Sequence, residues 1–289
     1  MTSSTGRARR PGPSVRVRVR EYDEGRTRRR EDRLATEEPL EVRLEWPGRP
    51  AERVAVTMRT PGHDFELAVG MLLAEGVLTP DALATVAYCT DVRLDPEQEF
   101  NVVTVTLSGP PDRLPAGRGA TVTASASACG VCGTDSIDDV VALGSVRTPA
   151  AVAAPVAPTL LTVLPARMRE AQRVFDSTGG LHAAALFDAS GELLVVREDV
   201  GRHNAVDKVV GARVLGGSPT AVPLLCVSGR IGFEIVQKAV AAGIGVLAAI
   251  GAPSSLAVRL AEEAGLCVVG FLSARRFVVY AGAERIDLD

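Results

Sequence analysis

Apolar and polar residues alternate through much of the first half of the chain, and this pattern predicts strands. Residues 40–46 (LEVRLEW) and 52–58 (ERVAVTM) alternate as a pair of neighbouring strands would. Further strands are expected near 84–93 and 100–107. Before them, the run from Asp64 (DFELAVGMLLAEG) places its apolar residues at helical spacing. We therefore predict a helix with one apolar face that ends at the glycine closing this run.

Short, continuous apolar runs alternate with amphipathic segments in the last third of the chain. The runs VPLLCVS, GVLAAI and LCVVGF have the pattern of strands that are buried on both faces. The intervening segments, IGFEIVQKAVAAG and SSLAVRLAEEAG, have helical periodicity, so crossovers between parallel strands are expected. Upstream, LHAAALFDASGELLVVRED is expected to form two strands, and PARMREAQRVFDSTGG a helix that starts at its proline.

These patterns predict an α/β protein made of two lobes. Residues 1–36 are rich in arginine, and because SVRVRVRE alternates, they fit either an edge strand or a tail. Residues 37–146 are expected to form a smaller, β-rich N-terminal lobe, and 147–161 a Pro/Ala-rich connector. Residues 162–289 are expected to form an α/β lobe of three layers around a mixed sheet. A short helix is also expected over 136–143.

The composition is that of a soluble globular protein. Hydrophobic residues make up 46% of the chain and charged residues 23%. The formal net charge is −3, so the charge of the chain does not indicate nucleic acid as a partner. No apolar run is long enough for a membrane helix, and no apolar segment follows the N-terminal arginines as in a secretory signal. The odd number of cysteines, five, argues against a disulfide framework. We therefore expect a cytoplasmic protein.

Arginines cluster in the turns that follow the predicted buried strands. In an open α/β sheet, ligands bind beyond the carboxyl ends of the strands. The turns there read EDVGRHN, SGRIG, GAPSS and GFLSARR, and they carry Arg202, Arg230, Arg275 and Arg276. Guanidinium groups beside helix N-termini favour a phosphate-like anion, such as a nucleotide. The alternative is that these arginines cap carboxylates on neighbouring loops. Neither a Walker A sequence nor a complete Rossmann fingerprint is present.

Histidine and lysine are both scarce. His63, His182 and His203 each lie in a turn-like context, which favours a functional role for at least one of them, although a lone histidine is usually structural. The chain has only two lysines, Lys208 and Lys238, and both fall within motif-like segments. A place on a solvated helix surface is an equally good interpretation of these lysines.

The segment SASACGVCGTDS contains two cysteines three residues apart, Cys129 and Cys132. They fit a bridge, half of a metal site or a reactive thiol pair. Zinc needs three or four ligands, and no second such pair exists. Zinc deaminases carry Pro-Cys-x-x-Cys with an upstream His-x-Glu, whereas Ala128 precedes this pair and the upstream residues, His63 to Glu66, have the wrong spacing.

A transfer of sulfur fits this cysteine pair best. A thioredoxin-like enzyme would place the pair at a helix start after its first strand, but this pair lies in mid-chain among glycine, alanine and serine. Thiols in such surroundings are expected to be accessible, and thiolate is the nucleophile that accepts or donates sulfur. The other cysteines, Cys89, Cys226 and Cys267, fall in predicted strands and are expected to be core residues.

Several motifs together resemble one known family, that of the formate dehydrogenase accessory sulfurtransferase, FdhD. The resemblance covers roughly 38–286 and rests on RTPGHDFELAVGMLLAEG, SACGVCG, TGGLHAAALF, EDVGRHNAVDKVVG, SGRIGFEIVQKA and APSSLAVRLAEEAGLCVVGF. It implies a cytoplasmic protein with a fold similar to that of cytidine deaminases. It also implies that sulfur is taken from a cysteine desulfurase as a persulfide. The sulfur then goes to the molybdenum cofactor, bis-molybdopterin guanine dinucleotide, before that cofactor enters formate dehydrogenase.

The resemblance also implies roles for particular residues. Cys129 matches the persulfide-bearing cysteine, with Cys132 as its partner. The family's cofactor-binding segment falls on Phe271, Leu272, Ser273, Ala274, Arg275 and Arg276. The strand-end turns add Arg230 and His203 to this expected cofactor site, with GDP as a surrogate ligand. Gly232 and Val278 depart from the family pattern, where serine and asparagine are expected.

Two further expectations concern assembly and a rival function. By resemblance alone, the protein is expected to be a homodimer that also meets formate dehydrogenase and the desulfurase. A non-catalytic chaperone that binds the molybdenum cofactor and protects it would share the cofactor site. The cysteine pair separates the two functions, because such a chaperone has no need of Cys129.

Overall fold

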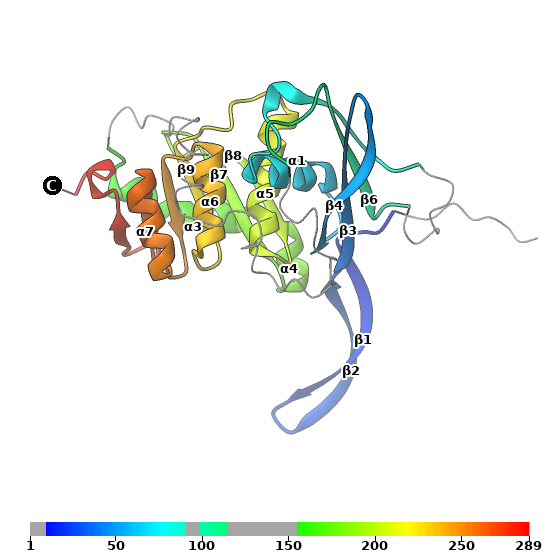
Figure 1. Cartoon of the computed structure of the whole chain (residues 1–289). Coiled ribbons are helices and arrows are strands. Elements are labelled where there is room, and N and C mark those ends of the chain that lie inside the picture. The colour runs from blue at the N-terminus through cyan, green and yellow to red at the C-terminus, as the bar shows by residue number, and fades with distance from the viewer. Residues whose placement is uncertain (1–9, 91–98, 115–154, 289) are drawn as a thin grey trace, which may run out of the picture.

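The chain folds into a body of two sheets with helices between and around them, from which a long hairpin extends (Figure 1). The structure is a computed structural model, and it describes residues 10–90, 99–114 and 155–288. No helix in these ranges is both long and apolar enough to cross a membrane. The expected helix over 136–143, both cysteines of the CxxC pair and much of the expected connector lie outside the described residues.

The larger sheet has six strands, and its centre is parallel as the sequence predicts. The strand order is β12-β11-β10-β9-β7-β8. The neighbours β9, β10 and β11 are parallel, whereas β7, β8 and β12 pair antiparallel to their neighbours. The strands are β7 (His182–Phe187), β8 (Leu193–Asp199), β9 (Leu224–Val227), β10 (Val246–Ala249), β11 (Cys267–Gly270) and β12 (Val278–Ala281).

Helices cover both faces of this sheet, which gives the expected three layers. The helices α5 (Arg202–Leu215), α6 (Phe233–Ala242) and α7 (Ser255–Ala264) lie on one face, and α3 (Pro158–Glu170) on the other. Successive side chains of a strand point to opposite faces. In β9, Leu225 and Val227 therefore join the core under α5 and α6, whereas Leu224 and Cys226 join the core under α3.

Cys226 and Cys267 are core residues, as the sequence predicts. Both are completely buried in the strands of the larger sheet. Burial raises the pKa of each thiol to about 12, so neither forms a thiolate near neutral pH. Cys89 is half-buried, and its Sγ lies 3.6 Å from Nη1 of Arg43.

The smaller sheet belongs to the N-terminal lobe and has the order β4-β3-β6-β5. Its strands are β3 (Glu38–Trp46), β4 (Arg49–Arg59), β5 (Leu83–Tyr88) and β6 (Val102–Leu107). The helix α1 (Asp64–Ala74) lies between this sheet and α5 (Figure 1). Every residue from Leu67 to Ala74 is buried, so the expectation of a single apolar face on this helix is wrong. A helix that is covered from two sides must be apolar around most of its circumference.

Two glycines allow α1 and α5 to cross in direct contact. A Cβ atom added at Gly70 of α1 would lie 1.9 Å from the carbonyl oxygen of Asp207 on α5. A Cβ atom added at Gly211 of α5 would lie 1.9 Å from the carbonyl oxygen of Glu66 on α1. Each glycine thus makes room for the other helix's backbone, and this crossing joins the two lobes into one continuous core.

Two segments fold differently from the sequence-based expectation. Residues 14–35 are neither a tail nor an edge strand of a larger sheet, because β1 (Ser14–Asp23) and β2 (Arg26–Ala35) pair only with each other. The helix expected to start at Pro165 starts at Pro158, inside the range expected to be connector, and Pro165 lies within it. A separate short helix, α4 (Arg173–Thr178), follows. Single-turn 3-10 helices lie at Pro80–Ala82 and Ala283–Arg285.

Candidate functional site

The turns that the sequence analysis singled out meet at one edge of the larger sheet. The parallel strands β9, β10 and β11 all end there, and β8 also ends and β7 begins at this edge. The helices α5, α6 and α7 start from the same edge. We call residues 228–232, 250–254 and 270–276, which follow β9, β10 and β11, the strand-end shelf. The placement is the one at which open α/β sheets bind ligands.

Backbone hydrogen bonds tie the three turns of the strand-end shelf together. The N–H of Gly251 donates to the carbonyl oxygen of Gly229 at 3.2 Å, and that of Phe271 to the carbonyl oxygen of Gly251 at 3.1 Å. The N–H of Ser254 donates to the carbonyl oxygen of Ile231 at 2.9 Å. A Cβ atom at Gly251 would lie 2.7 Å from the Gly229 oxygen, so the turns approach as closely as glycine permits. The shelf is therefore a preorganised surface.

The shelf presents three exposed arginines, Arg230, Arg275 and Arg276. None of them forms an ion pair with a carboxylate in the part of the chain that the structure describes, so the alternative role as carboxylate caps has no support there. The guanidinium carbon of Arg276 lies 5.9 Å from the ring centroid of Phe271. The hydroxyl of Ser273 accepts the backbone N–H groups of Arg275 and Arg276 at 3.4 and 3.2 Å and fixes this turn.

The expected cofactor segment divides into anchoring and exposed residues. Leu272 is buried and holds the segment in the core, whereas Phe271, Ser273, Ala274 and both arginines are exposed. Phe271 has a φ of 52°, in the left-handed region that non-glycine residues rarely adopt. Phe271 is 41% exposed, so an apolar side chain stands beside the guanidinium groups. A planar base and its phosphates would find both kinds of contact here.

Arg202 and His182 lie against the shelf and extend the expected set of residues. A Cβ atom at Gly229 would lie 3.3 Å from Cδ of Arg202 and 3.4 Å from Nδ1 of His182. The Nε atom of Arg202 is buried and has no hydrogen-bond partner among the described residues. Burial, with the positive charge of Arg202, lowers the pKa of His182. The signal for both residues was their place in turn-like sequence beside glycine.

His203 has a protein partner at the start of α5. Its Nε2 lies 3.1 Å from Oε2 of Glu234 on α6. Burial lowers the pKa of His203 to about 3, and the positive charges of Arg202, Lys238 and His182 act in the same direction. The imidazole is therefore neutral near pH 7, and its Nε2 remains in close polar contact with the Glu234 carboxylate. In this arrangement His203 joins α5 to α6 beneath the shelf.

The neutral state of His203 predicts a pH dependence of stability. Its pKa is lowered on folding, so the unfolded chain binds the proton more tightly, and this contribution to stability is present above about pH 6.5 and is lost as pH falls towards 3. Glutamine cannot titrate, and its amide group can donate a hydrogen bond to Glu234 from the same position. When the pH is lowered from 7 to 5, we expect the free energy of unfolding of the wild type to fall by about 1–2 kcal/mol more than that of His203→Gln. Urea unfolding at the two pH values measures this difference, and equal losses would contradict it.

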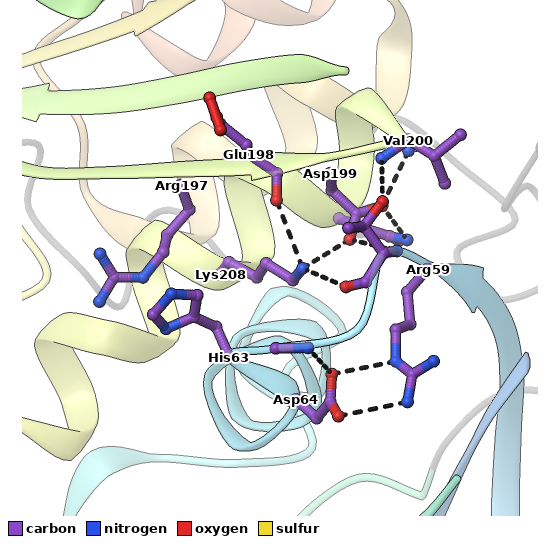
Figure 2. Close-up of polar contacts among 12 residues, drawn as sticks. Arg59, His63, Asp64, Arg197, Glu198, Asp199, Val200 and Lys208 are labelled. Atoms are coloured by element: carbon purple, nitrogen blue, oxygen red, sulfur yellow. Dashed lines mark hydrogen bonds and ion pairs between the residues drawn. The ribbon is translucent and has the colours of Figure 1, made fainter. Parts of the chain in front are cut away.

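A buried ionic network, which no pattern in the sequence indicated, joins the two lobes behind the site. Lys208 lies 2.6 Å from Oδ2 of Asp199, and its Nζ donates to the carbonyl oxygen of Thr60 at 2.9 Å (Figure 2). The Asp199 carboxylate also accepts the backbone N–H groups of Thr60 and Gly201. The network thus connects the segment before α1 to the start of α5. It holds the N-terminus of α5 beside the shelf.

A second buried pair lies in the same network region. Arg59 and Asp64 are joined by two hydrogen bonds of 3.0 and 3.2 Å, and both side chains are almost completely buried (Figure 2). The hydroxyl of Tyr88 donates to Asp64 at 2.8 Å. The other lysine, Lys238, is paired with the buried Asp207 at 2.8 Å. Both lysines of the chain are therefore structural, and the sequence signals that pointed to them were their scarcity and their place in motif-like segments.

The remaining residues that the sequence singled out lie away from the strand-end shelf or outside the residues that the structure describes. His63 is the residue before α1, is 54% exposed on its side chain, and lies 3.2 Å from Glu66. Cys129 and Cys132 are outside the described residues. Within the described ranges, no three His, Cys, Asp or Glu side chains come together as a metal site would require.

Comparisons with known proteins agree on one family. The sequence model of the FdhD/NarQ family matches residues 35–287. A protein named sulfur carrier protein FdhD from Streptomyces coelicolor is 50% identical over 276 residues, which cover 94% of each chain. A protein of the same name from Mycobacterium tuberculosis is 46% identical and covers 93% of this chain and 97% of its own.

One solved structure has the same fold. A crystal structure from Desulfotalea psychrophila, of a protein provisionally described as a formate dehydrogenase accessory protein, superposes with a TM-score of 0.71. It covers 94% of this chain and 99% of its own, at 22% sequence identity. At that level of identity the likeness concerns the fold, including the sheet that carries the strand-end shelf.

Proposed function

The chain belongs to the FdhD/NarQ family, and from this membership we propose that it is a sulfur carrier in the maturation of formate dehydrogenase. One observation carries the proposal, namely 50% identity over 94% of both chains to a protein named sulfur carrier protein FdhD. Such similarity over most of both chains makes a shared role the simplest expectation.

We propose that the sulfur travels as a persulfide on Cys129. The Cys129 thiolate attacks the outer sulfur of a persulfide on a cysteine desulfurase. The sulfur–sulfur bond of the desulfurase breaks, its cysteine leaves as a thiolate, and Cys129 carries the outer sulfur. The exchange needs no oxidant or reductant, because one sulfur–sulfur bond replaces another. Cys132 is proposed to assist this exchange.

We propose that the strand-end shelf binds the substrate that receives the sulfur, the molybdenum cofactor with its guanine dinucleotide groups. The support is chemical. Arg230, Arg275 and Arg276 are exposed and lack carboxylate partners in the described ranges, and guanidinium groups bind phosphate oxygens in pairs. Phe271 offers an exposed ring on which a base can stack. The N-termini of α6 and α7 add partial positive charge at the same edge.

The proposed cofactor site predicts that Arg230→Ala weakens GDP binding. Arg230 is exposed and has no protein partner among the described residues, so its removal should leave the fold intact. The loss of a charge-assisted hydrogen bond costs about 1.5–3 kcal/mol, or about 10- to 150-fold in the dissociation constant. Calorimetry with GDP measures the change. Arg213→Ala is the matched control, because Arg213 lies at the far end of α5 and donates to Pro219. Equal affinity of Arg230→Ala and the control would place the site elsewhere.

The rival function is a chaperone that binds the cofactor without carrying sulfur. The purified protein, incubated with a cysteine desulfurase and cysteine labelled in its sulfur, distinguishes the two. A carrier retains label that a thiol reductant removes, and a chaperone retains none while still binding GDP. Retention of label on the wild type but not on Cys129→Ser would support the carrier. We further propose, from the resemblance alone, a cytoplasmic homodimer.

A further inference from the structure

The hairpin of β1 and β2 has two faces of different electrostatic character. Residues directly opposite each other in an antiparallel pair lie on the same face. The register pairs Arg16 with Arg33, Arg18 with Glu31, and Arg20 with Arg29. One face therefore carries five arginines and one glutamate. We call this the arginine face, and its members besides these are Ser14, Tyr22, Thr27 and Ala35.

The arginines of the arginine face are exposed, and none of them has a carboxylate partner in the described part of the chain. All five are exposed to solvent. The opposite face differs, because Arg28 and Arg30 both pair there with Glu21, and Arg30 also pairs with Asp32 at 3.0 Å. The acids on that face thus form ion pairs with two of its three arginines, Arg28 and Arg30, and its formal charges, which include Asp23 and Arg26, sum to zero. The positive charge of the arginine face is therefore not neutralised within the hairpin and is available to an external anionic group.

Repulsion between arginines on the arginine face destabilises the hairpin, and a bound anion would offset this repulsion. The pairs Arg16–Arg33 and Arg20–Arg29 place like charges directly opposite each other, which destabilises a two-stranded ribbon. An isolated hairpin is already marginal in water. Alternate residues along a strand lie about 6.8 Å apart, so the arginines form two parallel rows. The hairpin extends away from the body, where a partner can reach these rows (Figure 1).

The charges around the arginine face favour an acidic protein surface over nucleic acid. The whole chain has a formal net charge of −3, so the body would repel a long polyanion. Glu31 stands among the arginines, and Asp23 and Glu24 lie at the tip of the hairpin. Their negative charges would repel the phosphates of a nucleic acid bound along this face. A protein partner needs only a local group of carboxylates. The family model begins at residue 35, at the end of β2, so the hairpin lies outside it.

We propose that the arginine face is a docking surface for a protein partner that presents rows of carboxylates. Such a surface speeds encounter and selects the partner mainly through complementary charge, so its effect is strongest at low salt. The proposal concerns a second surface of the protein and does not depend on whether Cys129 carries sulfur.

The test uses a labelled peptide of about ten glutamates, matched in length to the ten-residue strands, and follows its binding to the full chain by fluorescence anisotropy. The variant Arg18→Gln/Arg20→Gln removes two charges from the arginine face. The variant Arg28→Gln/Arg30→Gln removes two charges from the opposite face and is the matched control. We expect at least a fivefold loss of peptide affinity in the first variant and less than a twofold change in the control.

Three outcomes would overturn the proposal. Equal losses in both variants would mean that only the net charge of the hairpin matters. A failure of the wild type to bind the peptide would show that the arginine face does not bind rows of carboxylates. Tighter binding of a short DNA duplex than of the peptide at about 0.15 M salt, with the same dependence on the arginine face, would assign the face to nucleic acid. Circular dichroism confirms that both variants remain folded.

Discussion

Replacement of Cys129 by serine is expected to leave a folded protein that no longer supports formate dehydrogenase activity. Serine differs from cysteine by one atom, so we expect little change in stability. A hydroxyl cannot accept the outer sulfur of a persulfide, and the exchange therefore stops at the donor. In a strain that lacks the natural gene, the variant should give formate dehydrogenase activity at the background of the empty strain. Thermal unfolding of the purified variant should match the wild type.

Cys132→Ser is the matched control for this prediction. It changes the same atom three residues away, and it should reduce activity less than Cys129→Ser if Cys132 only assists. Equal loss in both variants would mean that sulfur passes between the two thiols. Full activity of Cys129→Ser would contradict the sulfur-carrier proposal and favour the chaperone. A loss of GDP binding in Cys129→Ser would instead indicate a disturbed fold.

The second large effect is expected at the crossing of α1 and α5. A methyl group at Gly70 or Gly211 would lie 1.9 Å from a backbone carbonyl oxygen of the other helix. Backbone cannot rotate away as a side chain can, so the helices must separate and the shared core must open. Alanine gains about 1 kcal/mol in helix propensity over glycine, which offsets part of this cost. We expect each Gly→Ala variant to lose about 2–4 kcal/mol of stability.

Denaturant unfolding of Gly70→Ala, Gly211→Ala and Gly109→Ala tests this prediction. A Cβ atom at Gly109 would meet no atom within 4 Å, so that variant controls for the effect of a methyl group on the unfolded chain. We expect Gly109→Ala to change stability by less than about 0.5 kcal/mol. Wild-type stability of either helix variant would mean that the two helices can separate without loss of core packing.

The strands of the larger sheet could be predicted because their signal is local. Runs such as Leu224–Val227 and Cys267–Gly270 are apolar throughout, as strands covered on both faces must be. Their ends then placed Arg230 and Phe271 at one edge by topology alone. The helix at Asp64 was also predictable, but its burial on nearly all sides was not. That burial depends on α5, which lies more than a hundred residues further along the chain.

Features that depend on long-range contacts escaped prediction for the same reason. Gly70 and Gly211 resemble ordinary helix glycines in sequence, and only their meeting in space explains them. The pairing of Lys208 with Asp199 and Thr60 likewise joins three distant segments. In residues 14–35 the alternation of valine and arginine indicated a strand but could not indicate its partner. The second strand, RTRRREDRLA, has too few apolar residues to produce a strand pattern.

The most direct test of the sulfur-carrier proposal is mass spectrometry of the peptide that contains Cys129. The protein is incubated with a cysteine desulfurase and cysteine, digested without reductant, and compared with Cys129→Ser treated in the same way. The proposal predicts a gain of about 32 Da, one sulfur atom, on the Cys129 peptide of the wild type, which a thiol reductant removes. No such gain on that peptide, or a gain on the peptides of Cys226 or Cys267 instead, would contradict it.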